Sequence, residues 1–431
     1  MIKESEYKKR RETLAKKLSN NSIAIILSSE YATRSNDTEY PYRQDSNFYY
    51  LTGFKENNTC LVILKTKKET RSILFVQKRD EALELWSGER LGAKKAKRRF
   101  LVDRVYLSED FKTKIKEFIV GKKHLYSDLN SKDSRVKTIL KLSKDFKTHQ
   151  NILEIIQKMR LFKSSAEIEL IKESINITAK AHHRVMRSNK IGKNELELQA
   201  MLEYEFKKNG AYSDAYTSIV ACANSANTLH YIENNRALVN GELILIDAGC
   251  EYNYYASDIT RTIPVNGKYT DPQKELYTLV LQTQVKIINM IKPGVKRSYL
   301  QETAEKLLTK GMIKLGILKG DCKKLIKKQE HKKYYPHGIG HWMGIDVHDP
   351  APYKDDKEQE IPLQKGMVLT IEPGLYIDKN DKSVPKKYRG IGIRIEDDIL
   401  ITKDGYENLS NSIVKRIQEI ESISYLSTKG E

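Results

Sequence analysis

The sequence predicts two domains: an α/β domain over residues 1–160 and an α+β domain over residues 161–431. A chain of 431 residues is longer than a typical single domain of roughly 100–200 residues. In its first part, short apolar runs alternate with helical stretches, which is typical of α/β domains. In its second part, several helices are followed by strand-like segments, which indicates α+β.

The N-terminal domain opens with a charged helical stretch at about residues 5–19. Three short apolar runs rich in β-branched residues follow, separated by polar turns: IAIIL (23–27), CLVIL (60–64) and SILFV (72–76). Runs of this length and composition predict buried strands. Helical stretches lie between the later runs, so this part of the chain is predicted to be an α/β domain.

A capping signal marks the start of the C-terminal domain. Ser164 is followed three residues later by Glu167, the spacing of a capping box at a helix N-terminus. Apolar residues then recur at helical spacing, so we expect this helix to reach about residue 187. The domain boundary is therefore expected near residues 160–165.

Three more helices are predicted in the C-terminal domain, at about residues 194–209, 271–291 and 298–316. Its strand-like segments are ELILIDAG (242–249), GMVLTIEPGLY (366–376) and GIGIRIEDDILIT (390–402). The strands look antiparallel and follow helices, which is the basis for the α+β prediction.

The composition restricts the class of protein. A hydrophobic content of 39% suffices for packed cores, and no run approaches the roughly 20 apolar residues of a membrane span. The first residues, MIKESEYKKRRE, lack the apolar core of a signal peptide. The four cysteines form no CxxC pair, which favours free thiols and a cytoplasmic protein.

The net charge of +19 raises the alternative of nucleic-acid binding. Basic clusters such as KKAKRR (94–99) and KKLIKK (323–328) could form such a surface. However, the excess charge is mostly lysine and is spread along the whole chain. We therefore interpret the charge as a lysine-rich composition and do not expect nucleic acid or a membrane as a partner.

Two aspartates are predicted to face each other across a hairpin. In LILIDAGCEYNYYASDITRT (243–262), an apolar strand ends on Asp247 and a second strand carries Asp258. If Tyr252 and Asn253 centre the hairpin, the two Cβ atoms lie about 4.5–5.5 Å apart. Two such carboxylates repel at neutral pH unless a cation lies between them. The alternative is a surface hairpin with solvated aspartates, but the apolar run before Asp247 favours burial.

Further acidic residues end or line other apolar strands. Glu372 ends one strand, and Pro373 follows it. In GIGIRIEDDILIT, Arg394 and Glu396 share one face, so the arginine is expected to hold a metal-ligating carboxylate in place. Asp397 falls on the apolar face, which predicts a bulge or an exposed edge there.

Histidines complete this set. The segment HGIGHWMGIDVHD (337–349) carries His337, His341 and His348, three of the nine histidines of the chain. Two Asp, two Glu and one His form an oxygen-rich set that suits a pair of hard or borderline divalent cations such as Mn²⁺. Each acid alone could be structural, but their combination with the histidines predicts a two-metal hydrolase site.

These motifs resemble a known family, the pita-bread metallopeptidases, and within it the aminopeptidase P group. The resemblance rests on HYIEN, IDAGCEYNYYASDITRT, HGIGHWMGIDVHD, TIEPGLY and YRGIGIRIEDD. It extends to the N-terminal domain through TRSNDTEYPYRQDSNFYYLTGF (33–54) and LWSGERLG (85–92). It implies a pita-bread C-terminal domain preceded by the N-terminal domain of this group.

The resemblance also implies roles for single residues. Two divalent metal ions, with Mn²⁺ expected, would be held by Asp247, Asp258, His341, Glu372 and Glu396. Glu372 would also accept the proton of the metal-bridging hydroxide. Residues that match catalytic positions are His230, His337, His348 and Arg394; those near the substrate are Tyr216, Tyr376, Asp37 and Trp86.

The implied reaction is removal of the N-terminal residue from peptides with proline in second position, by attack of that hydroxide. Two alternatives remain: an Xaa-Pro dipeptidase with the same ligands, and a catalytically inactive binding module. An inactive module is expected to lose ligands, whereas all five are present here.

Two features bear on the substrate. Where the family is expected to have an arginine after His348, this chain has Lys354 and Lys357, and lysine cannot form a bidentate guanidinium contact. Asp37 and Trp86 match N-terminal elements that reach a neighbouring subunit's site, which implies a homo-oligomer, with a tetramer expected. The alternative is that Trp86 is a core residue and Asp37 a turn residue.

Overall fold

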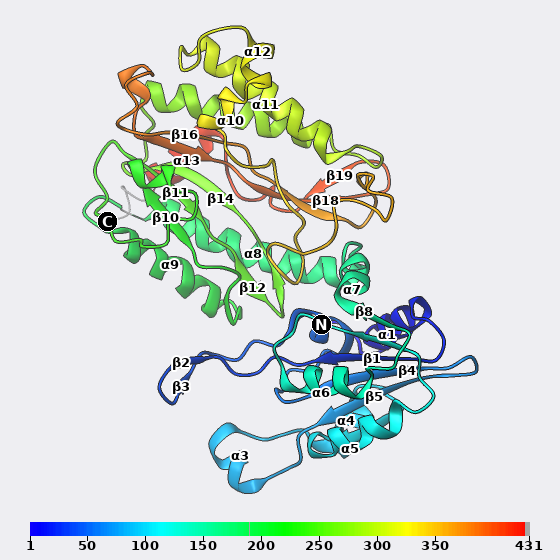
Figure 1. The fold of residues 1–431 in the computed structure, drawn as a ribbon. Helices are drawn as coiled ribbons and strands as arrows, with labels where there is room; N and C mark the ends of the chain where they lie inside the picture. The colour runs from blue at the N-terminus through cyan, green and yellow to red at the C-terminus, as the bar shows by residue number, and fades with distance from the viewer. Residues whose placement is uncertain (189, 427–431) are drawn as a thin grey trace. The chain divides into compact units, whose positions relative to one another are not determined.

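The structure, a computed structural model, describes residues 1–188 and 190–426. It divides into two compact units, Met1–Met159 and Arg160–Glu431 (Figure 1). The elements of the first unit are, in chain order, α1 (Glu4–Lys17), β1 (Ser22–Leu27), β2 (Thr33–Ser35), β3 (Thr38–Glu39), α2 (Ser46–Thr52), β4 (Cys60–Lys65), β5 (Thr70–Val76), α3 (Glu81–Ser87), α4 (Gly92–Arg99), β6 (Arg104–Leu107), α5 (Phe111–Phe118), β7 (His124–Ser127), α6 (Ser134–Leu142), β8 (Thr148–Asn151) and α7 (Ile152–Arg160), which ends on the first residue of the second unit.

The N-terminal unit is built around a six-stranded mixed sheet with the order β6-β5-β4-β1-β7-β8. The three apolar runs of the sequence form β1, β4 and β5, which pair antiparallel at its centre. Their buried side chains, such as Ile25, Val62 and Phe75, form one core cluster. This confirms the α/β prediction, because β6, β7 and β8 add parallel pairs joined through helices.

The second unit contains longer helices and shorter strands. Its elements are α8 (Ser165–Arg187), α9 (Glu195–Lys208), β9 (Ser213–Asp214), β10 (Ile219–Cys222), β11 (Leu243–Asp247), β12 (Cys250–Tyr252), β13 (Tyr255–Ala256), β14 (Thr260–Pro264), α10 (Asp271–Ile288), α11 (Arg297–Lys314), α12 (Cys322–Lys327), β15 (Val368–Ile371), β16 (Gly374–Ile377), β17 (Ile391–Arg394), β18 (Asp397–Ile401), β19 (Tyr406–Asn408) and α13 (Ile417–Leu426). The described residues also include four short 3₁₀ helices: η1 (Ser108–Asp110) in the first unit, and η2 (Ala223–Asn227), η3 (Glu330–Lys333) and η4 (Lys386–Tyr388) in the second.

Two layers of helices enclose the strands of this unit. Figure 1 shows α8 and α9 on one side of the strands and α10 and α11 on the other. The strands form small antiparallel sheets with the orders β10-β11-β14, β13-β12-β9, β15-β18-β19 and β16-β17. The predicted helices and the α+β class are confirmed, and Ser164 and Glu167 form the capping box at the start of α8.

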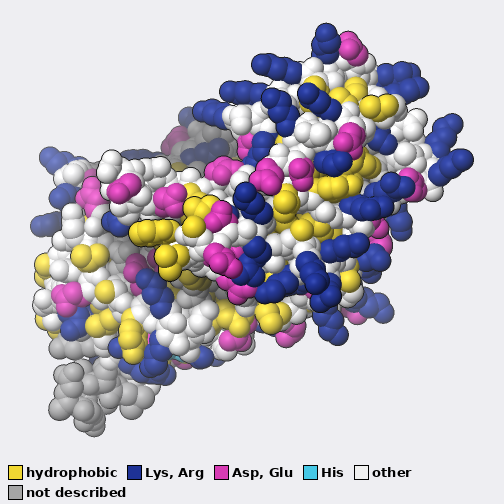
Figure 2. All heavy atoms as spheres, turned by 90° about the horizontal axis from the view of Figure 1, so that it is seen from below, with side chains coloured by type: hydrophobic (Ala, Val, Ile, Leu, Met, Phe, Trp, Pro, Cys, Tyr) yellow, Lys and Arg dark blue, Asp and Glu magenta, His cyan; other side chains and the backbone are white. Residues whose placement is uncertain are grey.

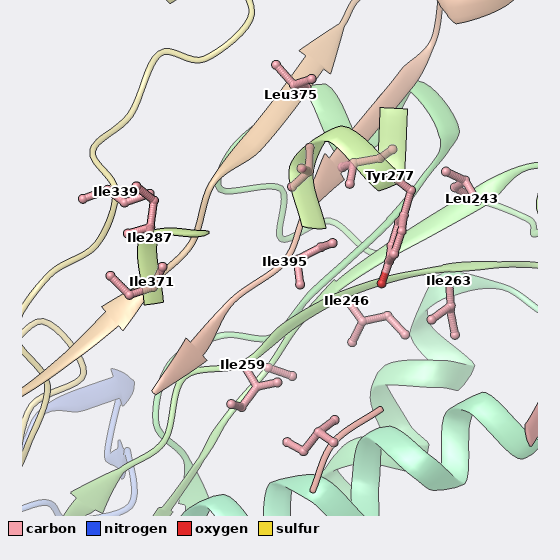
Figure 3. Close-up of a cluster of buried hydrophobic side chains, with 14 of the residues drawn as sticks. Leu243, Ile246, Ile259, Ile263, Tyr277, Ile287, Ile339, Ile371, Leu375 and Ile395 are labelled. Carbon is pink, nitrogen blue, oxygen red and sulfur yellow. The ribbon is translucent and has the colours of Figure 1, made fainter. Parts of the chain in front are cut away.

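One hydrophobic core fills the space between the strands and helices. Figure 3 shows Ile246 and Ile263 from the paired strands β11 and β14, with Tyr277 of α10 and Ile395 also in this cluster. All four side chains are almost fully buried. The core therefore holds the strand ends that carry the acidic residues in fixed positions.

The predicted register of the aspartate hairpin is wrong. Asp247 pairs with Thr260, not with Asp258. The turn is centred on Asn253 and Tyr254, which have φ values of 48° and 73°, so the hairpin turns one residue later than expected. Positive φ at both central residues gives a twist that suits a two-residue turn, and asparagine tolerates this conformation well.

Asp397 does not lie at an exposed edge, so this part of the prediction is also wrong. The chain leaves β17 after Arg394 and enters β18 at Asp397, which pairs with Ile371 of β15. The Asp397 carboxylate is fully buried and forms ion pairs with Arg261, at 2.8 Å, and with Lys415. Paired cations thus allow an aspartate to occupy a core position.

Basic side chains are dispersed over the face of the molecule that Figure 2 shows. Figure 2 shows lysines and arginines interspersed with acidic and apolar side chains over the face in view. Over residues 1–188 and 190–426, no helix has the length and apolar character required to span a membrane.

Candidate metal centre

A pocket of about 400 Å³ in the second unit collects most of the acidic residues and histidines singled out in the sequence. Its lining residues are Leu229, His230, Asp247, Asp258, His337, Gly338, Gly340, His341, His348, Tyr353, Glu372, Arg394 and Glu396. All five expected metal ligands are among them, although they span 150 positions of the chain.

The four carboxylates all lie at strand ends. Asp247 is the last residue of β11, Asp258 precedes β14, Glu372 follows β15, and Glu396 lies between β17 and β18. Asp247, Asp258 and Glu396 are buried, and each offers a carboxylate oxygen within 4.8 Å of the others. A second group of His341, Glu372 and Glu396 meets the same limit. Glu396 belongs to both groups, so it is placed to join two cation positions.

His341 presents one nitrogen to these acids. Its Nε2 lies 3.2 Å from Oδ2 of Asp258 and 3.8 Å from Oε1 of Glu372. Its Nδ1 lies 3.0 Å from the carbonyl oxygen of Trp342. Because that carbonyl can only accept, Nδ1 carries the hydrogen, and Nε2 of the neutral ring is left as a metal ligand.

A close approach of backbones fixes the position of His341. A Cβ atom on Gly340 would lie 1.9 Å from the carbonyl oxygen of Thr370, so only glycine fits there. The backbone N–H of Thr370 donates to the carbonyl of His341, and the His341 N–H donates to Oγ1 of Thr370. The histidine segment is thereby fastened to β15, two residues before Glu372.

Tyr216 joins the two aspartates. Its hydroxyl oxygen lies 2.6 Å from Oδ1 of Asp247 and 2.6 Å from Oδ1 of Asp258. Burial and the two carboxylates raise the pKa of Tyr216 well above its ordinary value. The hydroxyl therefore stays protonated and bridges the pair.

Arg394 connects a ligand carboxylate to the far side of the pocket. Its Nη2 donates to Oδ2 of Asp247 at 2.6 Å, its Nε to Oγ1 of Thr260, and its Nη1 to the hydroxyl of Tyr376. That hydroxyl lies 2.8 Å from Nε2 of His337. The sequence indicated a clamp on a ligating carboxylate, and the clamped carboxylate belongs to Asp247. Glu396 instead accepts a hydrogen bond from Thr260.

The electrostatics of the pocket favour a bound cation. Burial raises the pKa of Glu372 to about 7, and it raises that of Glu396 well above the ordinary range, with the other carboxylates adding to both shifts. Burial lowers the pKa of His341, but its hydrogen bond to Asp258 and the charges of Asp258 and Glu372 raise it to about 9 overall. Four carboxylates facing one arginine and one histidine leave an excess of negative charge, and an oxygen-rich set with one imidazole suits divalent ions.

Two further histidines lie at the mouth of the pocket. His230 and His348 are both exposed and line it. The rings of His348 and His341 meet edge to face, with centroids 4.2 Å apart. Asp258, His341 and His348 form a third group with ligand atoms within 4.8 Å, so geometry alone allows His348 to approach a cation.

Comparison with known proteins decides the family. Residues 169–403 match the model of metallopeptidase family M24, and residues 7–126 match the N-terminal domain of aminopeptidase P. The chain belongs to metallopeptidase family M24. The fold is therefore the pita-bread fold with an aminopeptidase P type N-terminal domain, and the protein is a metal-dependent hydrolase, as the motifs predicted.

Relatives cover the chain almost completely. Xaa-Pro aminopeptidase of Haemophilus influenzae is 39% identical, covering 98% of this chain and 97% of its own. The Escherichia coli enzyme of the same name is 40% identical, covering 99% of both. The structure of E. coli aminopeptidase P with the inhibitor Pro-Leu matches at a TM-score of 0.95, with 38% identity and 99% of both chains covered. A dipeptidase and an inactive module are not favoured by these M24 relatives.

The two N-terminal candidates belong to the other unit. Asp37 lies in the turn between β2 and β3 and is exposed. Trp86, in α3, is 88% exposed, so it is not a core residue. The pocket is lined only by residues of the second unit.

Sequence reasoning missed one wall of the pocket. Tyr353 lines it, stacks on Trp342 with ring centroids 5.4 Å apart, and lies 4.4 Å from the guanidinium of Arg297. Arg297 also donates to the carbonyl of Gly340 at 2.8 Å. The only sequence signal was an aromatic residue five positions after His348.

Proposed function

We propose that this M24 member removes the N-terminal residue from peptides that have proline in second position. One observation carries the proposal: the ligand atoms of Asp247, Asp258, His341, Glu372 and Glu396 converge in one pocket, in groups within 4.8 Å. The relatives that cover nearly the whole chain are named Xaa-Pro aminopeptidase, which supports this substrate class.

The five ligands would hold two divalent cations, for which we propose Mn²⁺. When bound, the cations lower the pKa of a water molecule and polarise the substrate carbonyl. Asp247, Asp258 and Glu396 would surround one position, and His341, Glu372 and Glu396 the other. Tyr216 and Arg394 orient Asp247 by hydrogen bonds of 2.6 Å each, so the first position is held rigidly.

Glu372 is the proposed general base. It faces the pocket and belongs to the group that would surround the second cation position. A carboxylate placed beside the attacking water can take its proton and pass it on. Glu372 then delivers the proton to the departing amine.

His230 and His348 are proposed to act on the substrate rather than on the metals. Both rings line the mouth of the pocket and are exposed, so they can donate to the oxygen on which negative charge develops. Nε2 of His337 lies within 2.8 Å of Tyr376. The chain from Asp247 through Arg394 and Tyr376 thus holds the imidazole of His337 in one orientation.

The substrate must present a free amino terminus to this acidic pocket. The free amino terminus would bind a metal or an acidic ligand, which makes the enzyme an exopeptidase. Proline has no N–H and adds a ring at the scissile bond, so the wall opposite the ligands must accept the ring. Lys354 and Lys357 follow His348 on an exposed loop, and we propose that they contact the residues after proline through single charges.

The N-terminal unit is proposed to act through assembly. Asp37 and Trp86 are exposed and are suited to contacting the substrate of a neighbouring subunit in a homo-tetramer. All four cysteines are free thiols, three of them buried, which supports a reducing compartment such as the cytoplasm. No nucleic acid is required as a partner.

The experiment compares peptides that differ only in their second residue. Mn²⁺-loaded protein is given Ala-Pro-Ala, Ala-Ala-Ala and the dipeptide Ala-Pro, and the released alanine is measured. We expect efficient cleavage of the Ala-Pro bond in Ala-Pro-Ala and little release from Ala-Ala-Ala. Equal rates on Ala-Pro-Ala and Ala-Ala-Ala would contradict proline specificity, and a strong preference for the dipeptide would indicate a dipeptidase.

A further inference from the structure

A buried ionic cluster lies outside the pocket, directly beside the segment that carries its histidines. Arg160 Nη2 lies 2.7 Å from Oδ1 of Asp349 and 2.5 Å from Oδ2 of Asp346. Lys163 Nζ lies 3.1 Å from Oδ2 of Asp349. The two cations stand at the start of the second unit, and the two acids belong to the histidine segment, so the cluster joins positions more than 180 residues apart.

Three members of the cluster are almost fully buried, whereas the side chain of Asp346 is 33% exposed. The side chains of Lys163 and Asp349 are each 1% exposed, and that of Arg160 is 2% exposed. Charges removed from water to this degree cost several kcal/mol each unless they are paired. Asp349 therefore cannot move away from Arg160 and Lys163 without leaving charges uncompensated.

The residues around the cluster are tightly packed. A Cβ atom on Gly344 would lie 2.5 Å from Oδ2 of Asp349 and 2.9 Å from Cε of Lys163. The backbone N–H of Lys163 also donates to the carbonyl of Gly366 at 2.8 Å, just before β15. The lysine is thus fixed at its backbone as well as at its ammonium group.

Asp349 directly follows His348, and its own backbone closes the histidine loop. The Asp349 N–H donates to the carbonyl of Trp342 at 2.9 Å. Consecutive Cα atoms are about 3.8 Å apart, so an anchored Asp349 leaves His348 little freedom at its backbone. His348 also meets the ring of His341 edge to face, with ring centroids 4.2 Å apart.

We propose that Lys163 and Asp349, with Arg160, are positioning residues for His348. This inference rests on the proposed function, in which His348 acts on the substrate. The cluster holds the imidazole in its productive place at the pocket mouth while remaining outside the chemistry. A displacement of about 1 Å from the productive geometry can cost about 100-fold in rate.

The test is a double-mutant cycle with Lys163→Met and His348→Ala on Mn²⁺-loaded protein. Lys163→Met is expected to lower kcat on Ala-Pro-Ala by about 10- to 100-fold, with KM changed little and metal content unchanged. In the His348→Ala background the same substitution is expected to change kcat less than about 2-fold, because residues acting as one unit are non-additive.

A double variant that leaves the net charge unchanged tests the inference even if Lys163→Met alone does not fold. Lys163→Met combined with Asp349→Asn removes one cation and one anion together, which a buried pair tolerates far better than loss of one partner. It is expected to fold and to show the same loss in kcat. The control is Lys190→Met: Lys190 is also buried, and it donates to the carbonyls of Met186 and Ser188. This control is expected to lose stability but to keep kcat.

The outcomes separate the inference from the proposed function. Wild-type kcat in folded Lys163→Met, or the same fold-loss with and without His348, would overturn the inference alone. Wild-type kcat in His348→Ala would overturn both the role of His348 and the inference. A loss in kcat that disappears in the His348→Ala background supports both.

Discussion

Arg394 donates a hydrogen bond of 2.6 Å from Nη2 to Oδ2 of Asp247, and both side chains are buried. The same guanidinium reaches Thr260 and Tyr376. A planar fork is needed for three partners in different directions, since lysine offers a single ammonium group. Arg394 therefore fixes one side of Asp247 and leaves its other oxygen for Tyr216 and a cation.

Replacing Arg394 with lysine tests this clamp. We expect Arg394→Lys to weaken metal binding or kcat by about 10- to 100-fold, the usual effect of losing a partner that orients a ligand. Metal content at limiting Mn²⁺ and kcat on Ala-Pro-Ala are the measurements. Arg389→Lys is the matched control, because the hydrogen bonds of the Arg389 side chain within residues 1–188 and 190–426 go to backbone carbonyls, those of Val384 and Lys382. Similar values for the two variants would argue against the clamp.

The metal-free protein is expected to lose stability as the pH rises. Burial raises the pKa of Glu396, and hydrogen bonding to Asp258 overcomes burial to raise that of His341 to about 9. Through these two groups the folded state binds more protons than the unfolded state, so their contribution to the free energy of unfolding falls from about pH 6.5 to about pH 8. Thermal unfolding of chelator-treated protein at both pH values measures the fall.

Glu396→Gln isolates one contributor to this pH dependence. The amide cannot ionise, so the variant's Tm is expected to fall less over the same pH range than that of the wild type. Glu205 is a buried acid outside the pocket. The Tm of the control variant Glu205→Gln should therefore fall with pH as much as that of the wild type. If the Tm of Glu396→Gln and that of the wild type fell equally with pH, the pKa of Glu396 would not be raised in the folded protein.

His348→Ala separates a substrate residue from a ligand. We expect the variant to keep both metals and to lose most of its activity, because His348 lies at the exposed mouth of the pocket. Elemental analysis and kcat are measured on the same sample. Its position near Asp258 and His341 makes the test decisive, since loss of a metal ion would identify His348 as a ligand.

Trp86→Ala tests the shared-site proposal. An indole that is 88% exposed is available to a neighbouring subunit, so its loss should change KM or the preference between Ala-Pro and Ala-Pro-Ala. Leu85→Ala is the control, since Leu85 is 83% exposed on the same helix. Size measurement of the native protein accompanies the kinetics. A fully active monomer, or a Trp86→Ala variant with wild-type preference, would exclude a shared site.

The elements that carry the site were predictable because their signals are local. Apolar runs predict the strand that ends on Asp247 and the strand that Glu372 follows, and the Ser164–Glu167 spacing predicts the cap of α8. The hairpin register was not predictable, because it depends on which two residues accept positive φ. Asn253 and Tyr254 are the two residues with positive φ, and no strong sequence signal predicts a positive φ at Tyr254.

Partners distant in sequence were the least predictable feature. Asp397 was expected at a bulge or an exposed edge, because no cation that could pair with it in a core is apparent from the neighbouring sequence. Its partners, Arg261 and Lys415, come close to it only in the folded chain. The same holds for Arg297 beside Tyr353 and for Lys163 beside Asp349. Local patterns carry no information about which cation compensates which buried acid.

We propose that the four acids of the pocket and His341 form a catalytic centre for two divalent cations. The most direct measurement follows the release of alanine from Ala-Pro-Ala while Mn²⁺ is added to metal-stripped protein, with metal content determined alongside. We expect no turnover without metal, a maximum at two ions per chain, and a loss of orders of magnitude in folded Glu396→Gln. Near wild-type turnover by the metal-stripped protein would contradict the account.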